Sequence, residues 1–167
     1  MRDATYTVLG LGSNLGDSRQ IIFDAIESIK GFLAESRNSS LYETDPLYVT
    51  DQGRFFNAAV SGFYHGTARE LLYHVNEIEA RFGRDRSREK RWGERFLDID
   101  ILLFGNCKIT EEDLEIPHPR LKERRFALEP LLELFPEAVE PCTGIPYRAI
   151  CEALPDQGVY KMNTINL

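Results

Sequence analysis

Residues 92–105 read WGERFLDIDILLFG, and their second half is apolar except for two aspartates, Asp98 and Asp100. The segment from Phe96 to Phe104 predicts a β-strand. Residues i and i+2 of a strand point to the same face, roughly 7 Å apart along the chain, so both carboxylates should face one spot. A strand this apolar is expected to be buried, and burying two unpaired anions together is costly. The pair therefore predicts a bound cation.

A basic segment precedes this strand. Between residues 81 and 95, seven cations stand against three carboxylates; they are Arg81, Arg84, Arg86, Arg88, Lys90, Arg91 and Arg95. Guanidinium groups bind phosphate oxygens bidentately and stabilise a phosphoryl group during its transfer. Trp92 is unusual in a solvated loop and could anchor it or cover a nucleotide. The combination predicts phosphate chemistry, and the alternative is a solvated, charged loop.

The two aspartates suit magnesium. This ion prefers oxygen ligands, keeps several waters and is completed by substrate phosphates. Two carboxylates on one face could hold two ions about 4 Å apart across a phosphoryl group. Taken alone, a D-x-D pair is also typical of a strand with an acidic, half-exposed outer face.

Length and composition predict one domain, residues 1–167, of an ordinary globular kind. The net charge of −7 and the pI of about 5.1 disfavour nucleic-acid and anionic-membrane partners, although a local basic patch is compatible with both values. Three cysteines without a CxxC spacing favour a reduced compartment. Because the first residues contain too short an apolar run for a signal peptide, we expect a cytoplasmic protein.

The hydrophobic pattern gives the order of the elements. Strands are expected at Thr5–Gly12, Ser39–Glu43, Phe55–Tyr64 and Phe96–Phe104, and helices from Ser18 to Leu33 and from Thr67 to Phe82. Asp17 or Ser18 should cap the first helix, and Thr67 with Glu70 forms a capping box for the second. The order predicts an α+β, ferredoxin-like βαββαβ sandwich with an antiparallel sheet, helices on one sheet face and the site on or beside the other. A small hairpin at 106–115 and additional C-terminal helices at 126–135 and 146–154 should follow.

Three further segments carry candidate site residues. His118 lies in IPHPRLKERRFAL and, with Arg124 nearby, could donate a hydrogen bond to a phosphate; a lone histidine is also often structural. Phe55 and Asn57 in GRFFNAAV combine an aromatic face with an amide that suits the edge of a heterocycle. Phe126 could supply a second aromatic face. The turn GSNLGD at residues 12–17 is not a Walker A loop, because no GK[ST] follows it.

These segments together resemble the 6-hydroxymethyl-7,8-dihydropterin pyrophosphokinases of folate synthesis. The similarity runs almost end to end, through GLGSNLGD, ETDPLY, FFNAAV, ELLYHVNEIEARFGR, RWGERFLDIDILLFG and IPHPRLKERRFALEPLLELFP. The resemblance implies a ferredoxin-like fold and transfer of diphosphate from ATP to the pterin hydroxymethyl group, with release of AMP. It implies two Mg²⁺ ions bound with ATP.

The resemblance also implies roles for individual residues. Asp98 and Asp100 would be the metal ligands and, with Arg84 and Arg95, the catalytic set. The ATP-binding residues would be Asn76, Glu79, Arg84, Arg86, Trp92, Arg95, Ile101, His118 and Arg124. The pterin-binding residues would be Thr44, Asp45, Leu47, Phe55, Asn57, Trp92, Asp98 and Phe126. Phe55 stands where the family frequently has tyrosine, so stacking is kept but the hydroxyl is lost.

Two alternatives remain at this point. A non-enzymatic ferredoxin-like module could bind RNA through its sheet, with Phe55 and Phe56 as stacking residues. The second alternative is a different magnesium-dependent phosphotransferase on the same scaffold. The set of Phe55, Asn57 and Phe126 argues against it, because these residues suit a flat heteroaromatic acceptor. The expected partners are small-molecule substrates, and the expected assembly is a monomer or a homodimer.

Overall fold

The computed structural model describes residues 3–48, 50–83 and 96–162. The strands are β1 (Thr5–Ser13), β2 (Ala34–Asn38), β3 (Tyr42–Thr44), β4 (Phe55–Tyr64), β5 (Asp98–Phe104), β6 (Ile109–Glu111), β7 (Leu114–Ile116) and β8 (Val159–Lys161). The helices are α1 (Ser18–Lys30), α2 (Ala68–Arg81), α3 (Arg125–Leu134) and α4 (Tyr147–Ala153), with a 3₁₀ turn at Leu121–Glu123. The expected combination of helices with an antiparallel sheet is confirmed.

The main sheet has the strand order β5-β1-β4-β3-β8, and β2 pairs with β4 beside β3. Every pairing in it is antiparallel. In this register, Gly12 of β1 lies between Asn57 of β4 and Asp98 of β5. Two residues along, Gly10 lies opposite Asp100. Because directly opposed residues of antiparallel strands share a face, the register places the amide and both carboxylates on the same side of the sheet.

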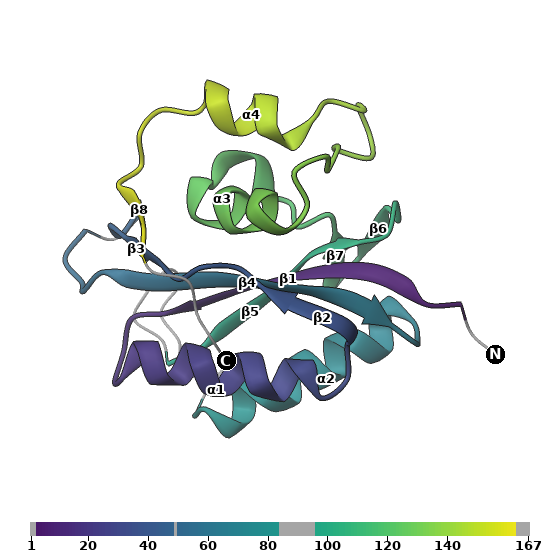
Figure 1. The fold of residues 1–167 in the computed structure, drawn as a ribbon, viewed down its shortest axis with the longest axis horizontal. Coiled ribbons are helices and arrows are strands. Elements are labelled where there is room, and N and C mark those ends of the chain that lie inside the picture. Colours follow the sequence, from purple (N-terminus) through teal and green to yellow (C-terminus); the bar gives the residue numbers. More distant parts are fainter. Residues whose placement is uncertain (1–2, 49, 84–95, 163–167) are drawn as a thin grey trace.

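Helices cover both faces of this sheet (Figure 1). On one face, α1 and α2 pack their apolar residues onto a core that includes Leu9, Leu11 and Ile99. On the other face, α3 and α4 contribute a second core, with Leu128 and Leu131 against the sheet. The expectation that helices cover one face was therefore incomplete, since the two C-terminal helices cover part of the other.

The helix starts follow the sequence rules. Asp17 caps α1 by accepting a hydrogen bond from the Gln20 backbone N–H at 3.2 Å. The capping box of α2 is present, because the Thr67 hydroxyl and the Glu70 carboxylate each accept from the other residue's backbone N–H. The hairpin expected after β5 is also confirmed, as β6 and β7.

Several boundaries and two strands were predicted wrongly. The helix α1 ends at Lys30, before Gly31, rather than at Leu33. The expected strand Ser39–Glu43 is replaced by β2 and β3, and β5 begins at Asp98 instead of Phe96. The sequence AESRN of β2 is largely exposed and lacks an apolar alternation, and β8 has only three residues. Such short or polar edge strands carry no period-2 signal.

No helix within the described part of the chain is long and apolar enough to cross a membrane.

Candidate active site

A pocket of about 750 Å³, open to solvent, lies on the α3 side of the sheet. Its wall combines strand residues with the start of α3 and the segment that follows β3. It brings together the predicted residues Thr44, Asp45, Leu47, Phe55, Asn57, Asp98, Asp100, Arg124 and Phe126. Residues predicted to bind two different substrates therefore line one cavity.

Two glycines, which the sequence analysis did not assign to the site, form part of its wall. A Cβ on Gly12 would lie 2.9 Å from Oδ1 of Asn57, and one on Gly10 would lie 3.1 Å from the Leu102 side chain. The missing side chains keep the sheet surface open between the amide and the carboxylates. A signal was present, because glycines at i and i+2 inside a strand often mark a close approach of backbone or ligand.

The two aspartates of β5 face the pocket as predicted. Asp98 and Asp100 line it, whereas Ile99 between them packs into the core beside α1 and α2. The expectation that both aspartates are buried was wrong. Both are half-buried, and the Asp100 side chain is 31% exposed. Because the carboxylates stay in contact with solvent, placing two like charges side by side costs less free energy than it would in a buried site. It also leaves the carboxylates accessible to a ligand.

His118 and Arg124 approach Asp100 from the segment before α3. His118 Nε2 lies 3.7 Å from one carboxylate oxygen of Asp100, and Nη1 of Arg124 lies 3.8 Å from the other. The Arg124 side chain is 8% exposed. A buried guanidinium beside a carboxylate can turn its donors to a phosphate that enters the pocket.

The imidazole of His118 is neutral at pH 7. Burial, and then the charge of Arg124, lower the pKa of His118 to about 4, although the charge of Asp98 acts in the opposite direction. The Arg120 backbone N–H donates to Nδ1 of His118 at 3.2 Å. The neutral ring therefore carries its proton on Nε2, which faces Asp100 and presents an N–H donor.

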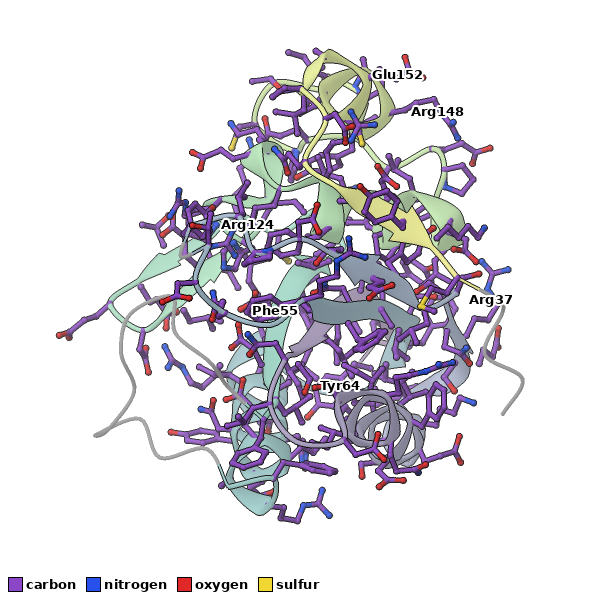
Figure 2. The ribbon with its side chains drawn as sticks, turned by 90° about the vertical axis from the view of Figure 1, so that its left-hand side faces the viewer. Arg37, Phe55, Tyr64, Arg124, Arg148 and Glu152 are labelled. Atoms are coloured by element: carbon purple, nitrogen blue, oxygen red, sulfur yellow. The ribbon has the colours of Figure 1, made fainter. Side chains whose placement is uncertain are left out.

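A second part of the pocket, which adjoins Arg124 at Phe126, is aromatic and amide-bearing. Phe55 at the start of β4 and Phe126 in the first turn of α3 both line it. Nδ2 of Asn57 donates to the Thr44 hydroxyl at 2.8 Å, and both residues are buried. In Figure 2, Phe55 and Arg124 lie on the same side of the molecule, away from Arg37. The cavity thus has an aromatic side and a charged side.

The chain after β3 is held by contacts from other parts of the fold. The Asp45 backbone N–H donates to the Gly158 carbonyl at 3.0 Å, which extends the pairing of β3 with β8. Nε of Arg54 lies 3.1 Å from the Asp45 carboxylate. Nδ2 of Asn14 donates to the Gln52 side chain at 3.1 Å. These contacts fix the segment between β3 and β4 against other parts of the fold.

Other predicted residues lie outside the pocket wall. Asn76 is on α2, and Ile101 packs in the core on the α1 and α2 side. Glu79, 1% exposed, accepts a hydrogen bond from the Ile99 backbone N–H at 2.8 Å and so supports the start of β5. The predicted site residues Arg84, Arg86, Trp92 and Arg95 lie outside the described residues.

The described residues contain no group of three or more His, Cys, Asp or Glu side chains placed to hold a metal ion. Asp98 and Asp100 supply two carboxylates, and an ion held by them would need its remaining ligands from water or from a bound molecule.

The fold and the pocket define a mixed α/β protein with a charged side and an aromatic side in one cavity. The chain belongs to the 7,8-dihydro-6-hydroxymethylpterin-pyrophosphokinase (HPPK) family, whose model matches residues 8–136. The resemblance found in the sequence is thereby confirmed.

Relatives agree with this assignment. The 2-amino-4-hydroxy-6-hydroxymethyldihydropteridine pyrophosphokinase of Bacillus subtilis is 40% identical over 138 residues, which cover 81% of this chain and 81% of the relative. A mitochondrial folate synthesis bifunctional protein of Arabidopsis thaliana is 44% identical over 155 residues, 92% of this chain and 27% of the relative. The crystal structure of wild-type Plasmodium falciparum HPPK-DHPS superposes with a TM-score of 0.72 at 16% identity, covering 91% of this chain and 45% of that one.

The chain spans only part of its plant and fungal relatives. It covers 20% of the Pneumocystis carinii protein and between 26% and 27% of the plant proteins.

Proposed function

We propose that the chain transfers the diphosphate of ATP to the hydroxymethyl group of 6-hydroxymethyl-7,8-dihydropterin and releases AMP. One observation carries the proposal: a single pocket joins the Asp98 and Asp100 carboxylates and Arg124 to the aromatic pair Phe55 and Phe126. Membership of the HPPK family supports the same reaction.

The acceptor binds on the aromatic side. Phe55 and Phe126 would stack on the faces of the flat pterin ring, which is the geometry that aromatic pairs favour. Asn57 would meet the edge of the ring, where its amide offers both a donor and an acceptor. Backbone groups of Thr44, Asp45 and Leu47 would complete the contacts on that edge. The open surface at Gly12 leaves room for the ring in front of Asp98.

The triphosphate binds on the charged side. Asp98 and Asp100 would hold two Mg²⁺ ions, because paired carboxylates at an open cavity fit an ion that is completed by water and phosphate oxygens. Bound magnesium would neutralise phosphate charge and orient the phosphoryl group. The His118 Nε2–H and the Arg124 guanidinium would donate to phosphate oxygens. Asn76, Glu79, Arg86, Trp92 and Ile101 stay proposed contacts on the nucleotide side, with Trp92 near both substrates.

Catalysis then consists of alignment and charge stabilisation. The pterin hydroxyl oxygen forms a bond to the β-phosphorus of ATP, the bond from that phosphorus to the oxygen shared with the α-phosphate breaks, and AMP leaves with this oxygen. The hydroxyl proton passes in the same step to a carboxylate oxygen of Asp98 or Asp100, or to water in the open pocket. Arg84 and Arg95 would close over the site and exclude water, which competes as a nucleophile.

The strand order supports a ferredoxin-like arrangement. If β2 and β3 are taken as one interrupted strand, the first four strands have the order fourth-first-third-second with antiparallel neighbours, as two split βαβ units require. We propose in addition that residues 1–167 form a single domain, because its two cores pack on the two faces of one sheet, and that it acts as a monomer or a homodimer. We also propose a cytoplasmic location, which the three cysteines outside any disulfide support.

The RNA-binding alternative is not supported. It needs Phe55 and Phe56 on one stacking surface, but neighbouring strand residues point to opposite faces. Phe55 lines the pocket, whereas Phe56 packs against the core of the other sheet face.

The test is product analysis with purified protein, ATP and Mg²⁺. We expect AMP to form in equal amounts with the pterin diphosphate when 6-hydroxymethyl-7,8-dihydropterin is present. The matched control is 6-methyl-7,8-dihydropterin, which keeps the ring but lacks the attacking hydroxyl and should give no AMP. Formation of ADP instead, or AMP release that is indifferent to the acceptor, would overturn the proposal.

A further inference from the structure

Tyr48 contacts the side chains of two arginines. The guanidinium carbon of Arg120 is 4.5 Å from the centre of the Tyr48 ring, and that of Arg124 is 5.7 Å away. Nε of Arg124 also donates a hydrogen bond to the Tyr48 hydroxyl at 3.3 Å. Tyr48 belongs to the segment between β3 and β4, which also carries Leu47 in the pocket wall. One side chain thus connects the proposed pterin segment to the proposed phosphate arginine.

The contacts of Arg124 explain why its orientation matters. The residue is 7% exposed. Its Nη1 lies 3.8 Å from Asp100, and its guanidinium carbon lies 5.6 Å from the centre of the Phe126 ring. The guanidinium is planar and donates in fixed directions. With Nε directed to Tyr48, an Nη group is directed towards Asp100, where the triphosphate is proposed to bind.

We propose that Tyr48 is a positioning residue for the reaction: its hydroxyl and ring hold the Arg124 guanidinium towards the phosphate side of the pocket. This inference rests on the proposed function. The hydroxyl fixes the plane of the guanidinium, and the ring covers a cation that has little contact with water. The role was not apparent from the sequence, where Tyr48 is one aromatic residue in a segment rich in turn-forming residues.

Tyr48 also lines the pocket, so a second role has to be separated from the first. If Tyr48 only lines the pocket, its substitution would change pterin affinity directly, whether or not Arg124 is present. If Tyr48 acts through Arg124, its substitution would change nucleotide affinity, and this change would disappear when the Arg124 guanidinium is removed. A double-mutant cycle distinguishes these two cases.

The experiment measures the dissociation constant of magnesium α,β-methylene-ATP, an analogue that cannot transfer its diphosphate, by calorimetry. We expect Tyr48→Phe to weaken analogue binding about threefold and Tyr48→Ala about tenfold, the range of a lost hydrogen bond and of a lost cation–π contact. Binding of the pterin alone should change less than about twofold in Tyr48→Phe, which keeps the ring. In steady-state turnover the same variants should raise KM for ATP more than they lower kcat.

The cycle is completed in an Arg124→Ala background, where neither Tyr48 substitution should weaken analogue binding further. Tyr73 on α2 is the matched control: it is 64% exposed and lies outside the pocket wall, and Tyr73→Phe should bind the analogue as the parent does. Melting curves report whether each variant is folded. If Tyr48→Ala does not fold, the comparison relies on Tyr48→Phe.

The inference is overturned if the Tyr48 substitutions weaken analogue binding equally with and without Arg124, or if they change only pterin binding. Because analogue binding needs no turnover, this outcome is distinct from failure of the proposed function, which the absence of AMP formation by the parent protein would show.

Discussion

Asn57 and Thr44 are joined side chain to side chain within the sheet: Nδ2 of Asn57 donates to the Thr44 hydroxyl at 2.8 Å. Asn57 is 5% exposed and Thr44 is 2% exposed. The bond uses one amide donor and fixes the amide plane, which leaves Oδ1 and the other N–H of Asn57 in defined directions. The amide is therefore oriented before any ligand arrives.

Thr44→Val tests this orientation. The valine has the same shape but no acceptor, so the buried Asn57 N–H loses its partner, which typically costs about 1–3 kcal/mol of unfolding free energy. We expect pterin affinity to fall about tenfold and affinity for the ATP analogue to stay within about twofold. Thr44→Ser, which keeps the hydroxyl, should restore pterin binding. A loss of nucleotide affinity with normal pterin affinity would contradict the proposed role of Asn57.

Gly12→Ala tests the open surface of the sheet. The new methyl group would lie 2.9 Å from Oδ1 of Asn57, too close unless the amide moves. Since the amide is held by Thr44, we expect pterin affinity to fall at least about tenfold, as measured by fluorescence titration. Gly53→Ala is a suitable control, because its Cβ would come no closer than 3.8 Å to the Asn14 carbonyl. Full pterin affinity in Gly12→Ala would show that the surface has more room than the structure gives it.

The sequence predicted the parts of the fold that have a strong period or a clear cap. The strands β1, β4 and β5 and the helices α1 and α2 carry apolar periods, and Asp17 and the Thr67–Glu70 box mark helix starts. The strands β2 and β8 were missed because their pairing with β4 and β3, rather than an apolar pattern of their own, defines them. Tertiary pairing is not visible in local sequence.

The site shows the same division. The same-face placement of Asp98 and Asp100 follows from the strand period alone, and the pocket contains them. The sequence left burial and half-exposure of the pair as alternatives, because the outcome depends on which segments cover this sheet face. The role of Gly12 depends on the register of three strands, and the role of Tyr48 depends on its contact with the distant residue Arg124. No local sequence motif encodes either of them.

Asp98→Asn and Asp100→Asn each remove one charge from the proposed metal site while they keep the side-chain shape. We expect turnover to fall more than about 100-fold in each variant, since even groups that only support metal ligands cost 10–100-fold when they are lost. Circular dichroism should remain native, because both aspartates are half-exposed. Asp113→Asn, at an exposed carboxylate that pairs with Arg69, should leave turnover unchanged. Magnesium-dependent activity retained in both pocket variants would exclude the metal assignment.

Glu140 gives a pH prediction for stability that is separate from the pocket. Its carboxylate is buried and accepts hydrogen bonds from the Cys142 and Thr143 backbone N–H groups and from the Thr143 hydroxyl. Burial alone would raise the pKa of Glu140, but these hydrogen bonds lower it to about 2. The unfolded chain has an ordinary glutamate pKa, near 4.5, and therefore binds more protons than the folded chain between pH 4.5 and 2.

The stability that the ionised Glu140 contributes is therefore complete above pH 4.5 and is lost as the pH falls towards 2. We expect Glu140→Gln to lower the free energy of unfolding at pH 7 and the difference from the parent to shrink in acid, as measured by urea unfolding at several pH values. Turnover at pH 7 should be unchanged, because Glu140 lies outside the pocket wall. The exposed neighbour Glu137 is the control, and Glu137→Gln should show no such pH-dependent difference. A Glu140→Gln deficit that stays constant from pH 7 down to pH 3 would mean that shape, and not the carboxylate charge, stabilises this turn.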